Sequence, residues 1–313
     1  MMEVVSYKYS DVLPVSISKT LIGYINKDVS GSLLVVKDQE VFLFLLVRNK
    51  MKFKIGYFLH PPVSDGKKIS RANEIEFFKK LTPFFKKEKL VDFVMPPLHL
   101  ENFSHIPEKS FGHKLGIISL PLMARTEEEI FAAFKPVYRR HIRKASKVNV
   151  KIKFGLEYFD DFYSIYSEKL QQENAVYDSY ESIKDIAFNS DNEIEVQCGV
   201  AYLDGEIEAG ILNISDLSKA YYFYGGVSKN AHNGSFRLLH WELIKQYIDK
   251  GIEAYQLGGK RDGEMLTLKH ERLASFKLGF GAIVEDGYHF VYVVNKIKYK
   301  LYQNLMKLKS KMK

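Results

Sequence analysis

The amino-acid sequence predicts a mixed α+β fold in two domains, built from mainly antiparallel sheets flanked by helices. Its 313 residues suffice for two domains that each bury a core of their own. Between residues 196 and 224 the apolar side chains adopt the alternating pattern of strands, and helical patterns lie before and after this stretch. We expect a boundary near 120–124. It separates an N-terminal domain, 1–124, from a C-terminal domain, 125–294, and 295–313 forms a basic amphipathic helix.

The N-terminal domain is predicted to contain a hairpin, a helix and a further strand. Strands are predicted at 32–37, 40–47, 52–59 and 90–94. The first two are separated by Asp38-Gln39, which is typical of a hairpin connection. Residues 72–87 carry apolar side chains at helical spacing, and Pro83 is expected to kink or break this helix because it has no backbone N–H to donate.

The C-terminal domain is predicted to alternate between helices and a three-stranded meander. Helices are predicted at 136–146, 159–172, 180–188 and 236–250, and strands at 150–154, 196–203, 206–214 and 219–224. A capping-box pattern at Thr126 begins an additional helix before them. Asp204-Gly205 favours a tight hairpin turn, Gly225-Gly226 is expected to end the third strand, and Ser235 is expected to be the N-cap of the next helix.

A glycine pair and a lysine distinguish the end of this domain. Residues 253–257 have the pattern of a short strand, and Gly258-Gly259 predicts a turn because glycine adopts backbone angles denied to other residues. Residues 267–278 are expected to form a helix that stops at Gly279, which places Lys277 in its last turn. The ammonium group of Lys277 either complements the negative end of the helix dipole or serves an anionic group in a site.

Charge and cysteine content limit the environment of the protein. The formal net charge of +8 favours anionic partners without indicating a dedicated nucleic-acid binder. Cys198 is the only cysteine, so the chain forms no internal disulfide; we expect it in the core and the protein in a reducing compartment. The first twenty residues lack the apolar segment of a signal peptide, and the longest apolar run, 41–47, is too short to cross a bilayer. We therefore expect a cytoplasmic protein.

Motifs of several common enzyme classes are absent from the sequence. Gly258-Gly259-Lys260 is followed by Arg261, so the phosphate-binding loop of a kinase is not formed. The nine histidines include no His-Glu-x-x-His helix, and no Gly-x-Ser-x-Gly turn is present. The sequence therefore predicts neither a metal site nor a hydrolase triad.

Two segments of the C-terminal domain resemble a known family. The later segment reads Gln256-Leu257-Gly258-Gly259 and then Phe276-Lys277-Leu278-Gly279-Phe280-Gly281, and the earlier one runs from Tyr138 to Val150. They resemble the "D-x-G-G", "F-K-x-x-F-G" and "R-x-x-I-R-K-A-x-K-x-G-V" motifs of the Fem peptidyltransferases (the FemABX group) and the related BioF-like acetyltransferases. The first motif lacks its acidic residue here, and Asn149 stands where glycine is usual. The resemblance covers residues 126–286.

The resemblance implies two units of the GNAT (N-acetyltransferase) fold and a site near Lys277. Lys277 would stabilise a developing oxyanion or position the donor's phosphate-ribose end. Phe276 would brace that helix turn, and Phe276, Gly258 and Gly259 would contribute to substrate binding. In ordinary members of the fold, the loop that corresponds to residues 228–235 of this chain binds the pyrophosphate of coenzyme A. Here the loop has one glycine and lacks the usual glycine spacing. Its Lys229 and the following Arg237 either supply charge to a ligand or are solvated surface residues.

A run of basic residues lies on the helix at 136–146. Arg139, Arg140, Arg143, Lys144 and Lys147 recur at spacings that place them on one broad face. This face either holds a polyanion or is simply solvated. We favour Arg143 as a phosphate contact because a guanidinium can grip phosphate in a bidentate manner, with Arg139 and Lys144 beside it.

The principal functional hypothesis is an acyltransferase without a tightly bound cofactor. It would move an aminoacyl group from aminoacyl-tRNA, or an acyl group from acyl-CoA, to an amine of an anionic cell-envelope precursor such as a muropeptide. The alternative is a non-catalytic module that binds an anionic glycan or a nucleotide-linked precursor. The tail helix at 295–313 has apolar residues at helical intervals: Ile297, Leu301, Leu305, Leu308 and Met312. It either docks on the protein through this stripe or makes a peripheral membrane contact.

Overall fold

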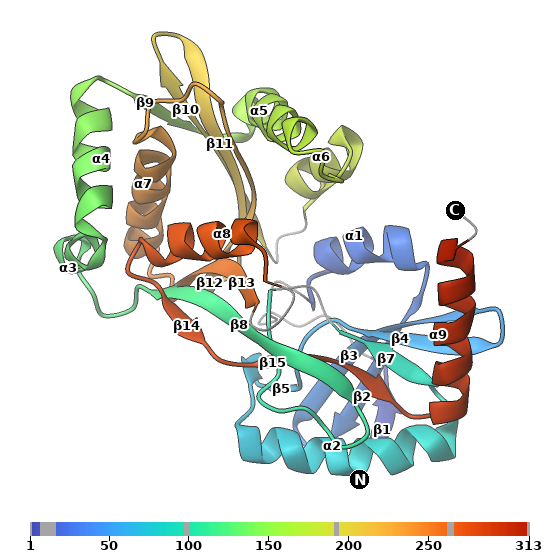
Figure 1. Cartoon of the computed structure of the whole chain (residues 1–313). Coiled ribbons are helices and arrows are strands. Elements are labelled where there is room, and N and C mark those ends of the chain that lie inside the picture. Colours follow the sequence, from blue (N-terminus) through green and yellow to red (C-terminus); the bar gives the residue numbers. More distant parts are fainter. Residues whose placement is uncertain (1, 7–16, 97–99, 191–193, 262–265, 312–313) are drawn as a thin grey trace. The chain divides into compact units, whose positions relative to one another are not determined.

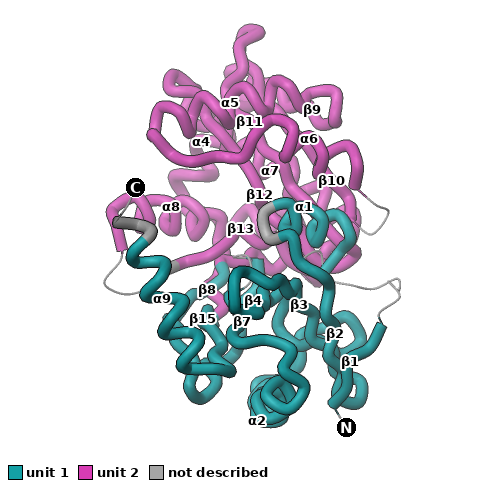
Figure 2. The backbone as a smooth tube through the Cα atoms, turned by 90° about the vertical axis from the view of Figure 1, so that its right-hand side faces the viewer, with its two compact units in different colours: residues 1–117, 261–265, 286–313 teal, residues 118–260, 266–285 magenta. Residues whose placement is uncertain are grey.

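The structure, a computed structural model, describes residues 2–6, 17–96, 100–190, 194–261 and 266–311. The chain forms two compact units (Figure 2). Unit 1 comprises Met1–Ile117, Arg261–Met265 and Asp286–Lys313, and unit 2 comprises Ile118–Lys260 and Leu266–Glu285. Residues 286–294, expected in the C-terminal domain, therefore belong to the same unit as the N-terminal strands. The mixed α+β fold with mainly antiparallel sheets is confirmed.

In its described residues, unit 1 is a mainly antiparallel sheet with three helices. Its strands follow the order β1-β2-β3-β4-β7-β15-β8, in which β4 and β7 are parallel and short β5 and β6 extend β3. The strands are β1 (Glu3–Val5), β2 (Ser32–Asp38), β3 (Val41–Lys50), β4 (Phe53–Phe58), β5 (Val63–Ser64), β6 (Lys67–Lys68), β7 (Phe93–Met95), β8 (Phe111–Pro121) and β15 (Tyr288–Val293). The helices are α1 (Lys19–Val29), α2 (Arg71–Glu88) and α9 (Lys296–Lys311). The predicted hairpin is confirmed as β2 and β3, with Asp38 opposite Val41.

Pro83, expected to kink or break helix α2, does not break it, because the helix continues to Glu88. Proline in a helix interior costs about 3 kcal/mol through a lost hydrogen bond and a steric clash. Four apolar side chains on both sides of the proline are buried in the core of unit 1: Phe77, Phe78, Leu81 and Phe85. Each such burial stabilises by about 1.5–3 kcal/mol, so packing outweighs the cost of the proline.

Unit 2 is a sheet covered by helices on both faces (Figure 1). Its strand order is β8-β13-β12-β11-β10-β9, in which only β12 and β13 of the registered pairs are parallel. The strands are β9 (Lys151–Phe154), β10 (Glu195–Leu203), β11 (Glu206–Ser215), β12 (Lys219–Val227), β13 (Ala254–Arg261) and β14 (Ile283–Glu285). The helices are α3 (Glu127–Ala133), α4 (Pro136–Lys147), α5 (Phe159–Gln172), α6 (Tyr180–Phe188), α7 (Ser235–Asp249) and α8 (Leu268–Leu278).

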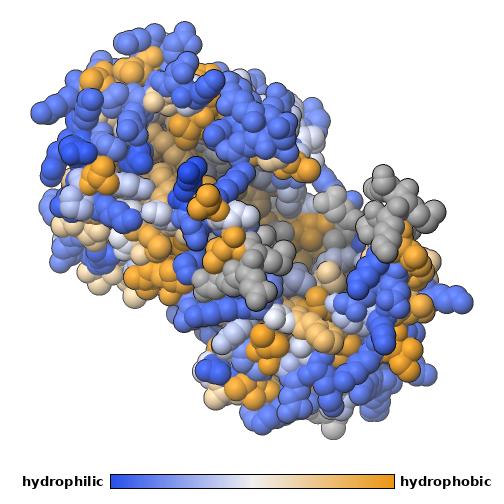
Figure 3. Space-filling model, viewed as in Figure 1, coloured by the Kyte–Doolittle hydropathy of each residue, from blue (hydrophilic) through white to orange (hydrophobic). Residues whose placement is uncertain are grey.

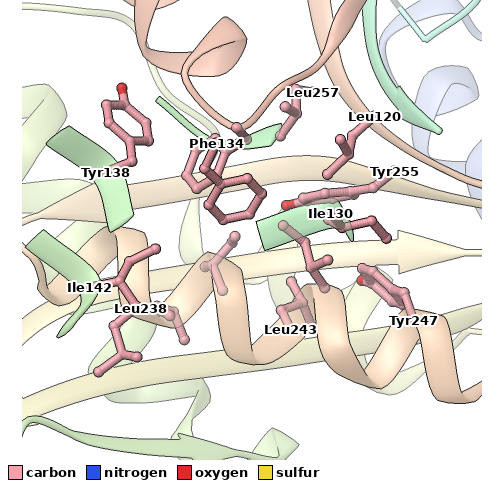
Figure 4. Close-up of a cluster of buried hydrophobic side chains, with 14 of the residues drawn as sticks. Leu120, Ile130, Phe134, Tyr138, Ile142, Leu238, Leu243, Tyr247, Tyr255 and Leu257 are labelled. Carbon is pink, nitrogen blue, oxygen red and sulfur yellow. The ribbon is translucent and has the colours of Figure 1, made fainter. Parts of the chain in front are cut away.

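Alternate residues of the central strands bury their side chains under different helices. Ile211 of β11 belongs to the cluster beneath α4 and α7, whereas its neighbour Leu212 packs with α5. In Figure 4, Phe134 lies within the first cluster, with Tyr138 of α4 and Leu238 of α7 nearby. The buried Cys198, as predicted, packs on the α5 side.

Several local predictions for unit 2 are confirmed. Thr126 and Glu129 form the capping box of α3, and α5 and α6 have the predicted bounds. Asp204 and Gly205 both have positive φ, 52° and 86°, as a tight hairpin turn requires. Asn149 takes the left-handed conformation, with φ 65°, at the position where the family motif has glycine.

The prediction that Gly225-Gly226 ends a strand is wrong, because β12 continues to Val227. A Cβ on Gly226 would lie 2.6 Å from the carbonyl oxygen of Ile165 in α5. The glycine therefore lets a helix backbone approach the strand rather than turning the chain.

The prediction of a turn at Gly258-Gly259 is also wrong. Gly258 and Gly259 lie inside the strand, which runs to Arg261, so the predicted turn is absent from this position. Gly258 nevertheless has a φ of 88°, which favours glycine.

Ser235 is the first residue of α7 rather than its N-cap, which is Gly234. A Cβ on Gly234 would lie 2.2 Å from the carbonyl oxygen of His141, so only glycine permits α4 to pack this closely. The Ser235 hydroxyl donates instead to Glu208, at 2.8 Å.

Helix α9 docks on unit 1, but through a different stripe from the predicted one. Tyr299, Tyr302 and Leu305 pack against β4 and β7. Of the predicted residues only Leu305 takes part: Ile297, Leu301 and Leu308 are exposed, and Met312 lies outside the described residues. Within the described parts of the chain, no helix is both long enough and apolar enough to span a bilayer.

Candidate functional site

The sheet of unit 2 opens between β12 and β13. These parallel strands pair only from Lys219 opposite Ala254 to Tyr221 opposite Gln256. Beyond that point β12 remains paired with β11 as far as Val227, while β13 continues to Arg261. In the described residues the facing edges of the two strands are therefore not registered with each other. Backbone N–H and C=O groups at a strand edge without a ladder partner need another hydrogen-bond partner, so the opening is a candidate site.

Lys277 lies at this opening. A Cβ placed on Gly258 would be 3.2 Å from the Lys277 Nζ, so the ammonium group lies against β13 two residues beyond the last paired position. The side chain is half-buried, and burial lowers the pKa of Lys277 from 10.5 to about 8. No hydrogen bond or ion pair within the described portion satisfies this ammonium. It is a desolvated cation that can also be present as the neutral amine near neutral pH.

Phe276 holds the last turn of α8 in place. Its ring stacks on Phe236 of α7 with centroids 5.6 Å apart, and its carbonyl oxygen accepts a hydrogen bond from the Tyr138 hydroxyl at 3.0 Å. Helix α8 ends at Leu278 as predicted, but Gly279 has a right-handed φ of −65°. Glycine is required there because a Cβ would lie 2.3 Å from the Tyr138 ring. The lysine thus stands on a turn anchored to α4 and α7.

A buried hydrogen-bond chain reaches His240 beside this turn. Asn213 Nδ2 donates to the hydroxyls of Tyr247, at 3.1 Å, and Tyr255, at 3.0 Å. The Tyr255 hydroxyl and His240 Nδ1 form a further hydrogen bond at 3.1 Å. Burial, then the charges of Lys277 and Arg237, lower the pKa of His240 to about 3, so the ring is neutral.

The basic residues predicted to bind a ligand do not form one cluster, and some of them contact aromatic rings or backbone carbonyl groups. The Arg237 guanidinium lies over the rings of Tyr138, at 4.4 Å, and Phe276, at 5.8 Å, near the opening. Arg139 donates to the carbonyl oxygens of Ala132, at 2.5 Å, and Phe134, at 2.6 Å. Its guanidinium therefore caps the end of α3.

Three predicted binding residues are exposed. Arg143 lies over the Phe131 ring at 5.4 Å, and Lys144 and Lys229 project from α4 and the loop before α7. The structure thus brings Lys277, Phe276, Gly258 and Arg237 together, whereas Gly259 is the next residue of β13.

A residue that the sequence analysis did not single out, Glu208, contacts the start of α7. Glu208 of β11 is buried, and its carboxylate accepts hydrogen bonds from the His232 N–H and the Ser235 hydroxyl. The Gly234 N–H donates to His232 Nδ1 at 3.3 Å, and the Ser235 N–H donates to the His232 carbonyl oxygen at 3.0 Å. Polar groups of the loop before α7 are therefore bonded within the protein.

Comparison with known families identifies the class of this unit. Residues 132–265 match the acetyltransferase (GNAT) domain family. These residues include the meander, α7 and β13, and thus both edges of the opening. The predicted resemblance to the Fem group of this superfamily is confirmed by the relatives below.

The relatives include aminoacyltransferases of Staphylococcus epidermidis. FemA is 28% identical over 105 residues, which cover 33% of this chain and 25% of FemA. FemB is 30% identical over 119 residues, which cover 35% of this chain and 27% of FemB. The matched region thus spans about a quarter of the length of these curated relatives.

Solved structures share the fold over most of the chain. A FemX crystal structure has a TM-score of 0.66 at 14% identity, with 95% of each chain covered. The C-terminal domain of a putative lysylphosphatidylglycerol synthetase from Agrobacterium fabrum has a TM-score of 0.55 at 14% identity, with 87% of each chain covered. At such identities the likeness establishes the fold alone.

Proposed function

We propose that this protein is an acyltransferase that moves an aminoacyl group to an amine of an anionic cell-envelope precursor. The observation that carries the proposal is the desolvated ammonium of Lys277 beside the parted strands β12 and β13. The GNAT match and the similarity to the aminoacyltransferases FemA and FemB support the same class of reaction.

The reaction joins the nitrogen of the acceptor amine to the carbonyl carbon of the donor. Attack produces a tetrahedral intermediate with a negative oxygen, and its collapse breaks the bond between that carbon and the leaving oxygen. The Lys277 ammonium stabilises the negative oxygen more strongly in a desolvated site than it would in water. Its pKa of about 8 lies near neutral pH, so it can also donate a proton to the leaving oxygen. The attacking amine releases its proton to water.

The loop before α7 favours aminoacyl-tRNA over acyl-CoA as the donor. A helix N-terminus binds a pyrophosphate through free N–H groups. Here the His232 N–H is bonded to the Glu208 carboxylate, and the Gly234 and Ser235 N–H groups are bonded to His232. Helix α4 also packs on Gly234. A buried carboxylate and fewer free N–H groups both oppose pyrophosphate binding at this position. An acyl donor that does not need a pyrophosphate site, such as aminoacyl-tRNA, therefore fits better.

The test supplies the purified chain with charged tRNA or with acetyl-CoA, each beside an amine-bearing muropeptide precursor. Products are identified by mass spectrometry. We expect transfer from charged tRNA, lost in Lys277→Ala and retained in Lys151→Ala, which removes an exposed lysine of β9. Transfer from acetyl-CoA alone would contradict the donor, and transfer from neither would contradict the reaction.

A further inference from the structure

Helix α9 has two chemically different sides. On the inner side, the Tyr302 ring lies 5.4 Å from that of Phe53 and 4.9 Å from that of Phe93, and Leu305 belongs to the same cluster. On the outer side, Ile297 is 83% exposed, Leu301 50% and Leu308 58%. Because these residues are four and seven positions apart, they lie along one side of the helix. The inner side accounts for docking, and the outer apolar side has no role in the core.

The charge of α9 is of one sign. Residues 296–311 contain six lysines and no acidic residue. A helix with exposed apolar residues among lysines is typical of segments that lie in the surface of an anionic bilayer. Figure 3 shows hydrophobic and hydrophilic residues side by side on this helix.

The hairpin between β3 and β4 extends this surface. Met51 at its tip is 69% exposed and stands between Lys50 and Lys52. Phe53, two residues further on, contacts Tyr302 of α9, which places the tip beside the helix (Figure 1). The same pattern of an exposed apolar side chain between lysines therefore occurs on two adjacent elements of unit 1.

A lysine-lined cavity of about 870 Å³ adjoins the start of α9. Its cationic residues are Lys54, Lys86, Lys89, Lys109, Lys296 and Lys298. Against them stand two carboxylates, Asp92, which pairs with Lys298 at 2.9 Å, and Glu108. Ile297 also lines the cavity, which joins it to the apolar side of the helix.

We propose that unit 1 binds the surface of an anionic lipid bilayer through α9, the β3–β4 hairpin and this cavity. Ile297, Leu301 and Met51 enter the boundary between headgroups and acyl chains, and the cavity lysines face headgroup phosphates. A nucleic acid would match the lysines but leave the apolar residues unexplained. An apolar protein surface would match the apolar residues but not the excess of positive charge. This proposal does not depend on the transfer reaction.

The test is co-sedimentation of the full chain with vesicles of phosphatidylcholine alone or of phosphatidylcholine mixed with phosphatidylglycerol. We expect binding to the mixed vesicles that weakens as salt is raised. The double variant Ile297→Ser with Leu301→Ser should bind roughly tenfold or more weakly, because apolar surface no longer leaves water. Its matched control, Val176→Ser with Leu217→Ser, removes two residues of unit 2 that are 102% and 81% exposed and should bind like wild type.

The electrostatic part has its own pair of variants. Lys89→Gln with Lys296→Gln should weaken binding roughly fivefold for each lysine, whereas Lys135→Gln with Lys151→Gln, exposed lysines of unit 2, should leave it unchanged. Unaltered circular dichroism spectra would confirm that the variants are folded. Equal binding to both vesicle types, binding to neither, or loss of binding only in the control variants would overturn the proposal.

Discussion

Replacing Lys277 with methionine should stabilise the protein while abolishing transfer. In the folded chain the pKa of this lysine is about 8, against an ordinary 10.5, because burial disfavours the charged form. Each factor of ten in proton affinity corresponds to 1.36 kcal/mol, so holding the ammonium in the fold costs about 3 kcal/mol below pH 8. Methionine fills a similar volume without a charge. The free energy of unfolding of Lys277→Met at pH 7 should therefore exceed that of wild type, by at most this amount.

The sign of the pH dependence follows from proton binding. Between about pH 8 and 10.5 the unfolded chain keeps the lysine proton that the folded chain has lost, so wild type gains stability as pH rises. The advantage of Lys277→Met should be fully present at pH 7 and should disappear towards pH 10.5. Urea unfolding at several pH values measures this, with Lys151→Met as the control at an exposed position. An advantage that is absent at pH 7, or equal at pH 7 and pH 10, would refute the reasoning.

Three further perturbations follow from particular contacts. Gly226→Ala should lower the free energy of unfolding by about 1–3 kcal/mol, because its Cβ would lie 2.6 Å from the Ile165 carbonyl oxygen; urea unfolding measures it. Glu208→Gln should increase the affinity for coenzyme A, measured by calorimetry, because a negative charge leaves the start of α7; unchanged affinity would contradict its blocking role. Arg143→Ala should weaken precursor binding with transfer retained at saturation; loss of precursor binding in this variant, with no transfer from either donor by the wild type, would instead favour a non-catalytic binding module.

The sequence predicted elements best where local signals agree. Helices α5 and α6 were predicted to the residue because apolar spacing defines their bounds, and the start of α3 was predicted because its capping box is local. Helix α1 and strand β8 were not predicted. The first half of β8 is exposed and the second half buried, so the strand lacks a single alternating pattern.

The site was only partly predictable, since its decisive features join residues distant in sequence. The family motif singled out Lys277. The burial of the Lys277 side chain, however, depends on Gly258, which lies against its ammonium, and on Tyr138, whose ring packs against Gly279 at the end of the same helix. The contact between Glu208 and Ser235 joins residues 27 positions apart, and no local sequence pattern predicts it. Gly225-Gly226 suggested the end of a strand and Gly258-Gly259 suggested a turn, because a sequence does not distinguish a glycine needed for a turn from one needed for a close approach.

The free energies involved separate the two interpretations of Lys277, as a cation that complements the helix dipole or as a group that serves a site. A cation that complements a helix dipole gains about 0.3–1 kcal/mol when it is exposed at the helix end. Here the ammonium is half-buried against β13 and its desolvation costs about 3 kcal/mol, so the dipole does not compensate for its position. A solvated lysine at the end of α8 would retain the favourable interaction with the helix dipole without the free-energy cost of desolvation. The turn is held inward by the Phe276 stack on Phe236 and by the Tyr138 hydroxyl, so the fold maintains an unfavourable placement. Such placements are typical of residues retained for chemistry.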